Sequence, residues 1–315
     1  ELGPAAHTTR KYEGLFGPQP NKSNTGATYR IRKPPLYDVN SGWAANYQSV
    51  DDESVNLTID KPRSVDVEIT DEEMHLNLTN FEEQVLGPAM SALAHHVNRE
   101  VMGLYDQVWN YIGTPLQNTT AAVDYLTAGA IMDDNCAPRD GSRAIFLPPH
   151  AMANTVDALK ALQNDQSKIA GQFRKGMIAK DVLGFDWHMT QIVRNHSSGS
   201  NAGAGAFNGA SQTGASLAVN SLTASTNRVF RKGDILDLTG YRPVNPVTKD
   251  QITNYLRRVV VTSDVASDGS NAATVPISPT LVASGKTQNV TGTMADAEAV
   301  LLFNAAATYA SGTWK

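Results

Sequence analysis

Two short runs in the first quarter of the chain alternate between apolar and polar residues, the pattern of a strand with one buried face. Lys61-Pro62-Arg63 separates the runs, so we predict a β-hairpin within residues 54–70. A lone hairpin is only marginally stable in water, so its apolar face needs a partner. The apolar positions are Val55, Leu57 and Ile59 in the first run and Val65, Val67 and Ile69 in the second.

The strongest helical pattern follows, with apolar residues at spacings of three and four. Asn80 can cap its start, and Gly113 ends it, which predicts a helix of some 25 residues. Such a helix would be about 38 Å long and would act as a spine. A coiled coil is the alternative, but Gly103 and only about three heptads give it thin support. The apolar positions are Leu86, Met90, Leu93, Val97, Val101, Leu104, Val108 and Ile112.

The rest of the chain divides into two regions of different character. Residues 117–196 predict a mixed α/β region, with a helix at 121–132, a strand at 144–147, a helix at 149–162 and strand-like character at 182–193. Residues 197–216 are rich in Gly, Ala, Ser and Asn and predict a flexible excursion. Short β-like runs with turn signals then predict a small all-β barrel or sandwich. The runs are 217–222, 235–238, 256–262, 273–277 and 281–283, and Ser278-Pro279 separates the last two. The Ala-rich stretch 296–307 that follows is compatible with a helix.

Composition narrows the class of protein. The 315 residues are enough for one large domain or about two ordinary ones. Charged residues make up 18% of the chain, against about 25% in an ordinary soluble domain, and a low charge is typical of surfaces that partners cover. The net charge of −5 provides no general attraction to nucleic acid or anionic lipid. The single Cys136 excludes an internal disulfide, and the apolar runs are too short to span a bilayer.

No motif in the sequence indicates catalysis. His95 and His96 are neighbours, about 100° apart on a helix, so they cannot share a metal as an i, i+4 pair would. Asp133-Asp134 lacks the alternating spacing of a calcium loop and predicts a turn. We therefore predict no catalytic, cofactor-binding or metal site. A soluble hydrolase acting from residues 117–196 is the alternative from a different class.

The order of these segments resembles the major capsid (coat) proteins of tailed bacteriophages with the Hong-Kong-97-type fold. Within them it is most similar to the coat proteins of short-tailed Salmonella-type phages, which carry an inserted β-barrel domain. The stretches that carry the resemblance are Tyr29-Arg30-Ile31-Arg32-Lys33-Pro34-Pro35 before the 54–70 hairpin, Leu93-Ala94-x-x-Val97, Arg143–Pro149, Phe173-Arg174-Lys175-Gly176, Gly184-Phe185-Asp186, Lys232-Gly233-Asp234, Val259-Val260-Val261-Thr262, Ile277-Ser278-Pro279, Asn289-Val290 and Ala295-Asp296-Ala297.

The resemblance implies an α+β fold and a division of the chain. The expected parts are an N-terminal arm (1–27), an extended β-hairpin loop (28–70), a peripheral domain with the spine helix (71–116), an axial domain (117–196) and the inserted β-barrel (197–312). In that family the chain returns after the insertion, so the remainder of the axial and peripheral domains is expected beyond residue 315, and we expect the chain to be incomplete at both ends. In some relatives the segment that corresponds to 197–216 is a charged loop that contacts a neighbouring capsomer. Residues 197–216 are Gly/Ala-rich in this chain, so we do not carry that contact over.

The implied function is geometric: copies of the chain assemble into an icosahedral shell around double-stranded DNA. Expected partners are other copies in hexamers and pentamers, scaffolding and portal proteins, and DNA bound without sequence specificity, with no cofactor and no membrane. The expected location is the virion capsid, after assembly in the host cytoplasm. An encapsulin-like shell is the structural alternative, although the β insertion argues against it.

The resemblance places the hairpin over an adjacent subunit, which would bury its apolar face. We predict that basic and acidic groups pair between subunits and set the register, while apolar contact supplies most of the affinity. The acidic partners would lie at 51–53 and 71–73. The predicted contact residues are Arg30, Arg32, Lys33, Asp51, Asp52, Glu53, Lys61, Arg63, Val65, Val67 and Ile69.

Overall fold

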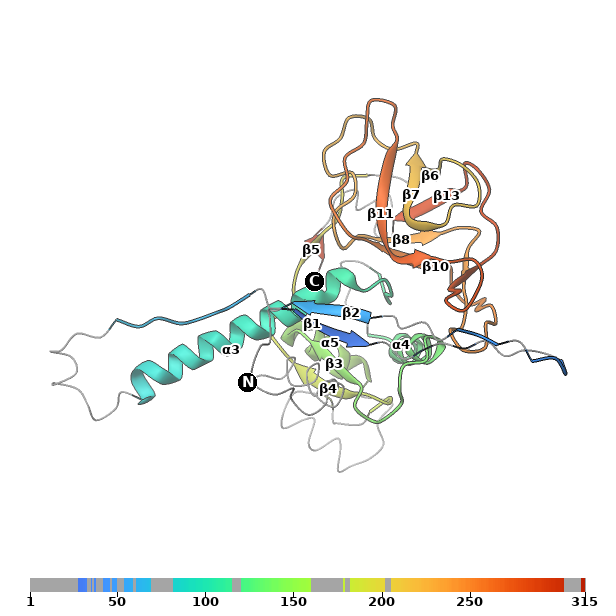
Figure 1. Ribbon diagram of the computed structural model, residues 1–315. Coiled ribbons are helices and arrows are strands. Elements are labelled where there is room, and N and C mark those ends of the chain that lie inside the picture. Colours follow the sequence, from blue (N-terminus) through green and yellow to red (C-terminus); the bar gives the residue numbers. More distant parts are fainter. Residues whose placement is uncertain are drawn as a thin grey trace. The chain divides into compact units, whose positions relative to one another are not determined.

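A computed structural model describes most of the chain (Figure 1). The described residues are 28–32, 35, 37, 42–45, 47–49, 54–58, 61–68, 82–114, 120–159, 178, 182–201, 205–302 and 313–314. The predicted arm at 1–27 and the predicted contact residues Lys33, Asp51, Asp52, Glu53 and Ile69 lie outside them. The chain divides into two compact units, Glu1–Met102 and Gly103–Lys315, and each is described by itself.

In the first unit, strand β1 (Thr28–Arg32) pairs antiparallel with β2 (Ser54–Thr58). The register places Ile31 opposite Val55 and Arg30 opposite Asn56, so an apolar residue pairs with an apolar one and a polar residue with a polar one. The prediction that 54–58 pairs with 65–69 is therefore wrong. Residues 61–68 form neither helix nor strand, because two of their side chains contact a helix instead of a neighbouring strand.

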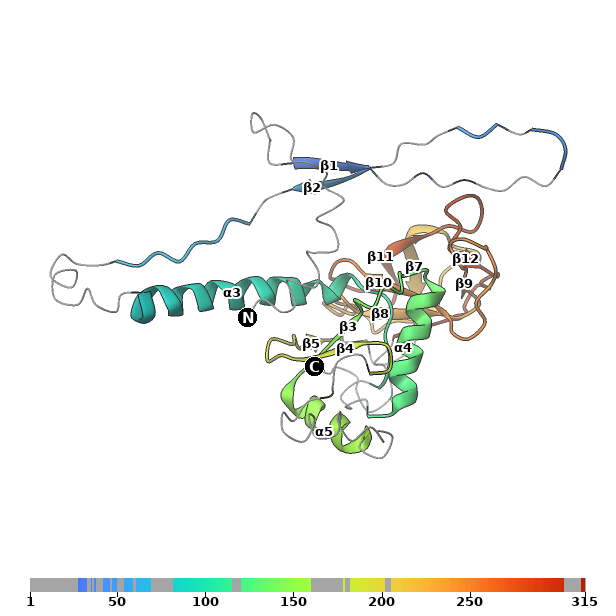
Figure 2. The same cartoon turned by 90° about the horizontal axis from the view of Figure 1, so that it is seen from below.

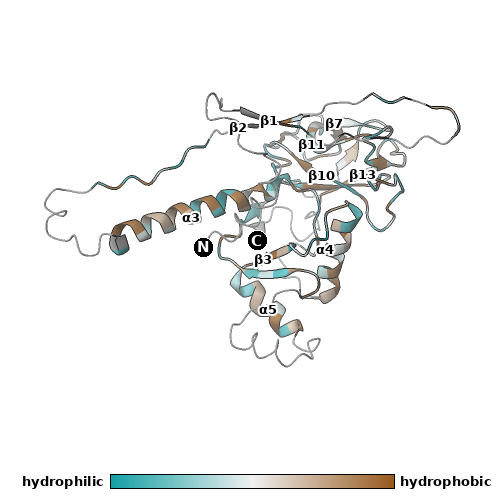
Figure 3. Ribbon diagram, turned by 60° about the horizontal axis from the view of Figure 1, so that its bottom comes forward, coloured by the Kyte–Doolittle hydropathy of each residue, from teal (hydrophilic) through white to brown (hydrophobic). Residues whose placement is uncertain are grey.

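The predicted long helix forms, but not as one uniform α-helix. A π-helical turn, η2 (Glu82–Leu86), leads into α3 (Gly87–Met102), and the first residues of the second unit form a 3₁₀ turn, η3 (Gly103–Gln107). Pro88 suits the first turn of α3 because it lacks an N–H. Figure 3 shows apolar residues recurring along α3, yet Asn98 is its one buried residue, and Met90 is 64% exposed. The apolar stripe of this helix therefore lies open rather than in a core.

The second unit begins with an α/β part that encloses a small core. Helix α4 (Ala122–Asp134), strand β3 (Ala144–Leu147), helix α5 (Pro149–Leu159) and strand β4 (Asp186–Met189) follow in order, and β3 pairs parallel with β4 (Figure 2). Met152 and Trp187 are fully buried, and the Tyr125 ring meets the Trp187 ring edge-on at 4.8 Å. The predicted elements at 121–132, 144–147 and 149–162 are confirmed over their described residues. Of the strand-like run at 182–193, only β4 forms.

A closed barrel follows the α/β part of the second unit, which confirms the prediction of a small all-β barrel (Figure 1). Its antiparallel strands run in the order β10-β11-β7-β6-β13-β8. Alternate residues point inward, as Val259 and Val261 do on β10, and these side chains are fully buried. The strands are β6 (Gly205–Phe207), β7 (Gly214–Asn220), β8 (Ile235–Leu238), β10 (Arg257–Val261), β11 (Ala273–Leu281) and β13 (Ala299–Leu302).

Short ladders outside the barrel complete the unit. Strand β9 (Arg242–Pro243) pairs with β12 (Val290–Thr291), and β5 (His196–Ser197) pairs with β14 (Thr313–Trp314). None of the helices in the described ranges is both long and apolar enough to cross a membrane.

Three predictions in the barrel region are wrong. The stretch 197–216 contains β6, whose Phe207 is fully buried in the barrel core. The stretch 296–307 contributes strand β13 where a helix was considered, because a short apolar run does not by itself distinguish the two. Strand β11 continues through Ser278-Pro279, and its register with β7 shifts between Pro276 and Leu281, so a β-bulge absorbs the expected break.

Candidate subunit-contact surface and polar networks

The predicted contact residues Arg30 and Arg32 lie on β1, in the exposed ladder that it forms with β2. Arg30 is exposed and its Nε donates a hydrogen bond to Ser54 Oγ over 2.7 Å, which joins the two strands through their side chains. Arg32 is also exposed, and Val55 is 49% exposed. The ladder therefore presents basic and apolar side chains together within the first unit.

Residues 61–68, which we call the strap, lie against α3. Lys61 Nζ is 3.3 Å from Glu100 Oε2, and Arg63 Nε donates to His96 Nε2 over 2.8 Å. The strap is therefore antiparallel to the helix, since the higher-numbered strap residue meets the lower-numbered helix residue. Four helical residues rise about 6 Å. Two residues of an extended chain span about 7 Å, so alternate strap residues match an i, i+4 pair on α3.

At this contact the carboxylate of Glu100 lies near the positive charge of Lys61 and the ring of His96. His96 Nε2 also lies 3.9 Å from Glu100 Oε1, so one carboxylate faces both Lys61 and the histidine. The hydrogen bond from Lys61 and its positive charge hold the pKa of Glu100 below its usual range. These groups are well exposed, and exposed ion pairs of this kind contribute little to stability because solvent and salt screen them. The contact positions the strap more than it stabilises the fold.

Sequence reasoning missed both helix partners of the strap. It assigned acidic partners to 51–53 and 71–73, which lie outside the described residues. The available signal was the i, i+4 spacing of His96 and Glu100, which places their side chains on the same side of the helix. Val65 and Val67 are 45% and 49% exposed, so the strap leaves both of these predicted contact residues open.

In the second unit, a buried chain of polar groups fastens η3 to the base of the barrel. His196 Nε2 lies 2.9 Å from Asp234 Oδ1, and its Nδ1 lies 3.0 Å from the Tyr105 hydroxyl. Asp234 Oδ2 also accepts hydrogen bonds from the backbone N–H groups of Gly199 and Arg231. Burial raises the pKa of Tyr105 above its usual value. The buried Asp234 carboxylate therefore has hydrogen-bond partners on both oxygens, from His196 and from two backbone N–H groups.

A second polar chain lies beside the first along the same segment. The Tyr111 hydroxyl donates to Asp237 Oδ2 over 2.5 Å, and Arg258 Nε is 3.3 Å from Asp237 Oδ1. The Arg258 guanidinium lies 3.9 Å from the centre of the Tyr111 ring and donates to the Tyr111 carbonyl. Burial raises the pKa of both Tyr111 and Asp237. Strands β8 and β10 therefore hold the residues that follow η3.

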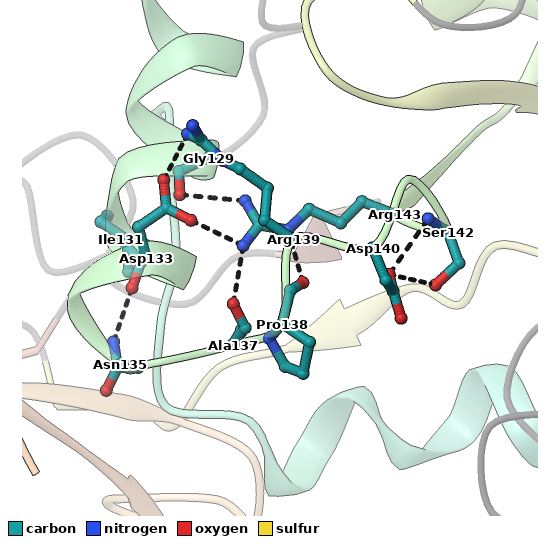
Figure 4. A network of polar contacts seen from close by, with 10 residues as sticks. All are labelled: Gly129, Ile131, Asp133, Asn135, Ala137, Pro138, Arg139, Asp140, Ser142 and Arg143. Carbon is teal, nitrogen blue, oxygen red and sulfur yellow. Dashed lines mark hydrogen bonds and ion pairs between the residues drawn. The ribbon is translucent and has the colours of Figure 1, made fainter. Parts of the chain in front are cut away.

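A third network closes the turn between α4 and β3 (Figure 4). Arg143, whose side chain is 4% exposed, donates to Asp133 Oδ1 over 2.6 Å and to the carbonyl of Ala137 over 2.9 Å. Arg139 reaches the other oxygen of Asp133, so one carboxylate meets two guanidinium groups. The hydrogen bond from Arg143 lowers the pKa of Asp133. Of the turn predicted at Asp133-Asp134-Asn135-Cys136, the two aspartates are the last residues of α4, whereas the C-cap Asn135 and Cys136 form a turn.

The described residues hold no group of three or more His, Cys, Asp or Glu side chains arranged to bind a metal ion. The polar clusters of the described part join segments to one another, and their carboxylates are engaged by arginine, lysine, tyrosine or backbone donors.

A family model matches most of the chain. A family model described as "P22 coat protein - gene protein 5" matches residues 40–312. A solved structure titled "Mycobacterium phage Che8" has a TM-score of 0.44 and 15% identity, covering 96% of this chain and 90% of that chain. The "Capsid structure of the Cyanophage P-SCSP1u" has a TM-score of 0.43 and 12% identity, covering 88% and 83%. No curated protein matches the chain.

Proposed function

Since this chain belongs to the P22 coat protein family and is a major capsid protein of the phage virion shell, we propose that residues 28–70 join neighbouring subunits of an icosahedral shell around double-stranded DNA. The family match favours this function over the encapsulin-like shell and the hydrolase. A protein of this kind works by repetition, because each contact recurs between many identical copies.

The observation that carries the proposal is the open apolar surface of the first unit. Val55 shares the β1–β2 ladder with Arg30, and Val65 and Val67 share the strap with Arg63; each of these valines keeps nearly half of its surface exposed. Apolar residues with charged neighbours are typical of an interface whose apolar part supplies affinity and whose charges set the register. A neighbouring subunit would bury the valines and offer carboxylates to the arginines.

The same reasoning extends to the parts of the subunit. We assign the extended loop to 28–70, the peripheral domain to 71–116, the axial domain to 117–196 and the inserted barrel to 197–312. The parallel β3–β4 pair with its own core supports an axial unit, and the closed barrel supports a separate insertion.

We also propose the wider set of partners. Copies would form hexamers and pentamers, with scaffolding and portal proteins, during assembly in the host cytoplasm. DNA would be enclosed without sequence-specific contacts. The excess of 31 acidic over 26 basic residues supports this view, since tight binding to the phosphate backbone requires a basic surface.

The test is a charge reversal on the exposed ladder. Arg30→Glu combined with Arg32→Glu should impair assembly of shells while the subunit keeps its far-UV circular dichroism and its unfolding midpoint. Arg30→Lys combined with Arg32→Lys is the matched control, because it keeps both charges, and it should assemble normally. Negative-stain microscopy and light scattering measure the outcome. Normal particles from the charge-reversed variant would overturn the proposed contact.

A further inference from the structure

One ring nitrogen of His96 lies between a group that can only donate a hydrogen bond and a group that can only accept one. Arg63 Nε donates to His96 Nε2 over 2.8 Å, and the same Nε2 is 3.9 Å from Glu100 Oε1. A guanidinium has no acceptor, so the contact with Arg63 requires Nε2 to carry no proton. An ionised carboxylate accepts only, so a strong hydrogen bond to Glu100 requires Nε2 to be protonated.

We propose that the contact of the strap with α3 is an acid-sensitive latch, closed while His96 is neutral and opened when Nε2 takes up a proton. Protonation removes the acceptor of Arg63 and places a positive charge against its guanidinium. The same proton lets His96 compete with Lys61 for Glu100. The Arg63–His96 and Lys61–Glu100 contacts are thus both weakened by one event, and histidine changes charge between about pH 5 and pH 8.

The charges around His96 support this direction. The strap contributes Lys61, Arg63 and Asp66, and Asp66 accepts a hydrogen bond from Ser64. The helix contributes His95, Arg99 and Glu100 next to His96. Lys61, Arg63 and protonated His96 would place three positive charges around the single carboxylate of Glu100. Repulsion within this group falls on the strap, because α3 is held by its own backbone hydrogen bonds.

His196 shows why the partner decides the outcome. Its Nε2 faces the carboxylate of Asp234, and its Nδ1 faces the hydroxyl of Tyr105. A hydroxyl can donate to a neutral ring or accept from a charged one, so both contacts survive protonation. His96 faces an arginine in place of a hydroxyl and has no such tolerance. The two histidines therefore respond in opposite ways to the same proton.

An open strap has a consequence for a single subunit. The strap carries Val65 and Val67, so its release from α3 would move both valines together with Lys61 and Arg63. The inference concerns one chain in solution and stands independently of the proposed function. A subunit that failed to form shells would still show the latch.

The test measures the distance between the strap and the helix in the full chain. Nitroxide labels are attached at two exposed positions through Val67→Cys and Met90→Cys, in a Cys136→Ser background. Pulsed electron paramagnetic resonance then gives the distance between the two labels. At about pH 8 the distribution should be short and narrow, and at about pH 5 it should become long and broad. His96→Gln should keep the short distance at both values, since glutamine stays neutral and its oxygen accepts from Arg63. His96→Lys should give the long distance at both.

His95→Gln is the matched control, because it removes the neighbouring histidine and leaves the Arg63 contact intact. It should open with acid as the parent does. Three results would overturn the latch: an unchanged distance in the parent, opening of His96→Gln at about pH 5, or loss of opening in His95→Gln. Far-UV circular dichroism at each pH separates release of the strap from unfolding, because unfolding would also remove the helical signal. Unfolding by acid would in addition lengthen the distance in His96→Gln.

Discussion

The hydroxyl of Tyr111 donates a hydrogen bond to Oδ2 of Asp237 over 2.5 Å, joining the segment after η3 to strand β8 of the barrel. The two groups are 126 residues apart in the chain. Arg258 of β10 contacts both of them, so three segments distant in the sequence meet in one partly buried cluster. Together with the chain from Tyr105 to Asp234, this cluster gives the barrel fixed attachments to residues 103–114.

Tyr111→Phe should therefore destabilise the second unit. The variant keeps the ring that Arg258 covers but leaves Asp237 without one donor, and a buried acceptor that loses its partner costs about 1–3 kcal/mol. Urea unfolding followed by circular dichroism should show a lower midpoint. Tyr47→Phe, at a residue that is 94% exposed, removes the same hydroxyl and should leave the midpoint unchanged. Equal midpoints for the two variants would contradict the role of the cluster.

Gly205 is required by close packing between barrel strands. A Cβ at this position would lie 2.6 Å from Val219 Cγ1, well inside normal contact distance. Gly205→Ala should therefore lower the free energy of unfolding by about 1–3 kcal/mol, as over-packed cores do. Gly269→Ala is the control, since a Cβ there meets nothing within 4 Å. Thermal unfolding measures both variants, and a neutral Gly205→Ala would mean that β6 does not pack against β7 as described.

The Asp133–Arg143 pair should make stability depend on acid. The hydrogen bond from Arg143 lowers the pKa of Asp133 below its ordinary value of 3.8. The stabilisation is complete above the pKa of the unfolded chain and is lost as the pH falls through the lower pKa of the folded chain. Asp133→Asn should thus be less stable than the parent at neutral pH, and the difference should shrink below about pH 4.

Asp134→Asn provides the matched control for that experiment. Burial raises the pKa of Asp134, so its ionised form opposes folding at neutral pH and replacing it with a neutral amide relieves that cost. The difference from the parent should have the opposite sign and should also vanish in acid. Urea unfolding at several pH values measures both variants. A loss of stability in Asp133→Asn that is the same at every pH would show that packing, and not charge, is responsible.

Local pattern predicted the elements whose character is set by their own residues. Ala144–Leu147 and Ile235–Leu238 are short apolar or alternating runs between turn signals, and both are strands with the predicted bounds. Helix α4 and the helical region around α3 follow from spacing in the same way. The pairing of β2 with β1 did not follow, because a period of two says which face is apolar and not which distant strand lies beside it.

The missed residues share one physical cause. Strand β6 lies in a stretch of Gly, Ala and Asn with little hydrophobic signal, and it is a strand because β7 and β13 supply its hydrogen bonds. His96 and Glu100 are two of several polar residues on α3, and the strap residues that contact them are 33 and 39 residues away. Tertiary contact determines these features, and no local window contains both partners.

The barrel should fold without the rest of the chain. The residues of its buried cluster lie between Phe207 and Leu302, so a fragment of 197–312 contains the whole core and the strands that close it. It loses Tyr111, the partner of Asp237, and His196, a partner of Asp234, which lowers its stability without opening the barrel. We expect one cooperative unfolding transition in urea with a β-type circular dichroism spectrum. A fragment of 211–312 is the control: it lacks β6, leaves the edges of β7 and β13 unpaired and should lose that transition. A molten or aggregated 197–312 would show that the barrel depends on the segment that Tyr111 anchors.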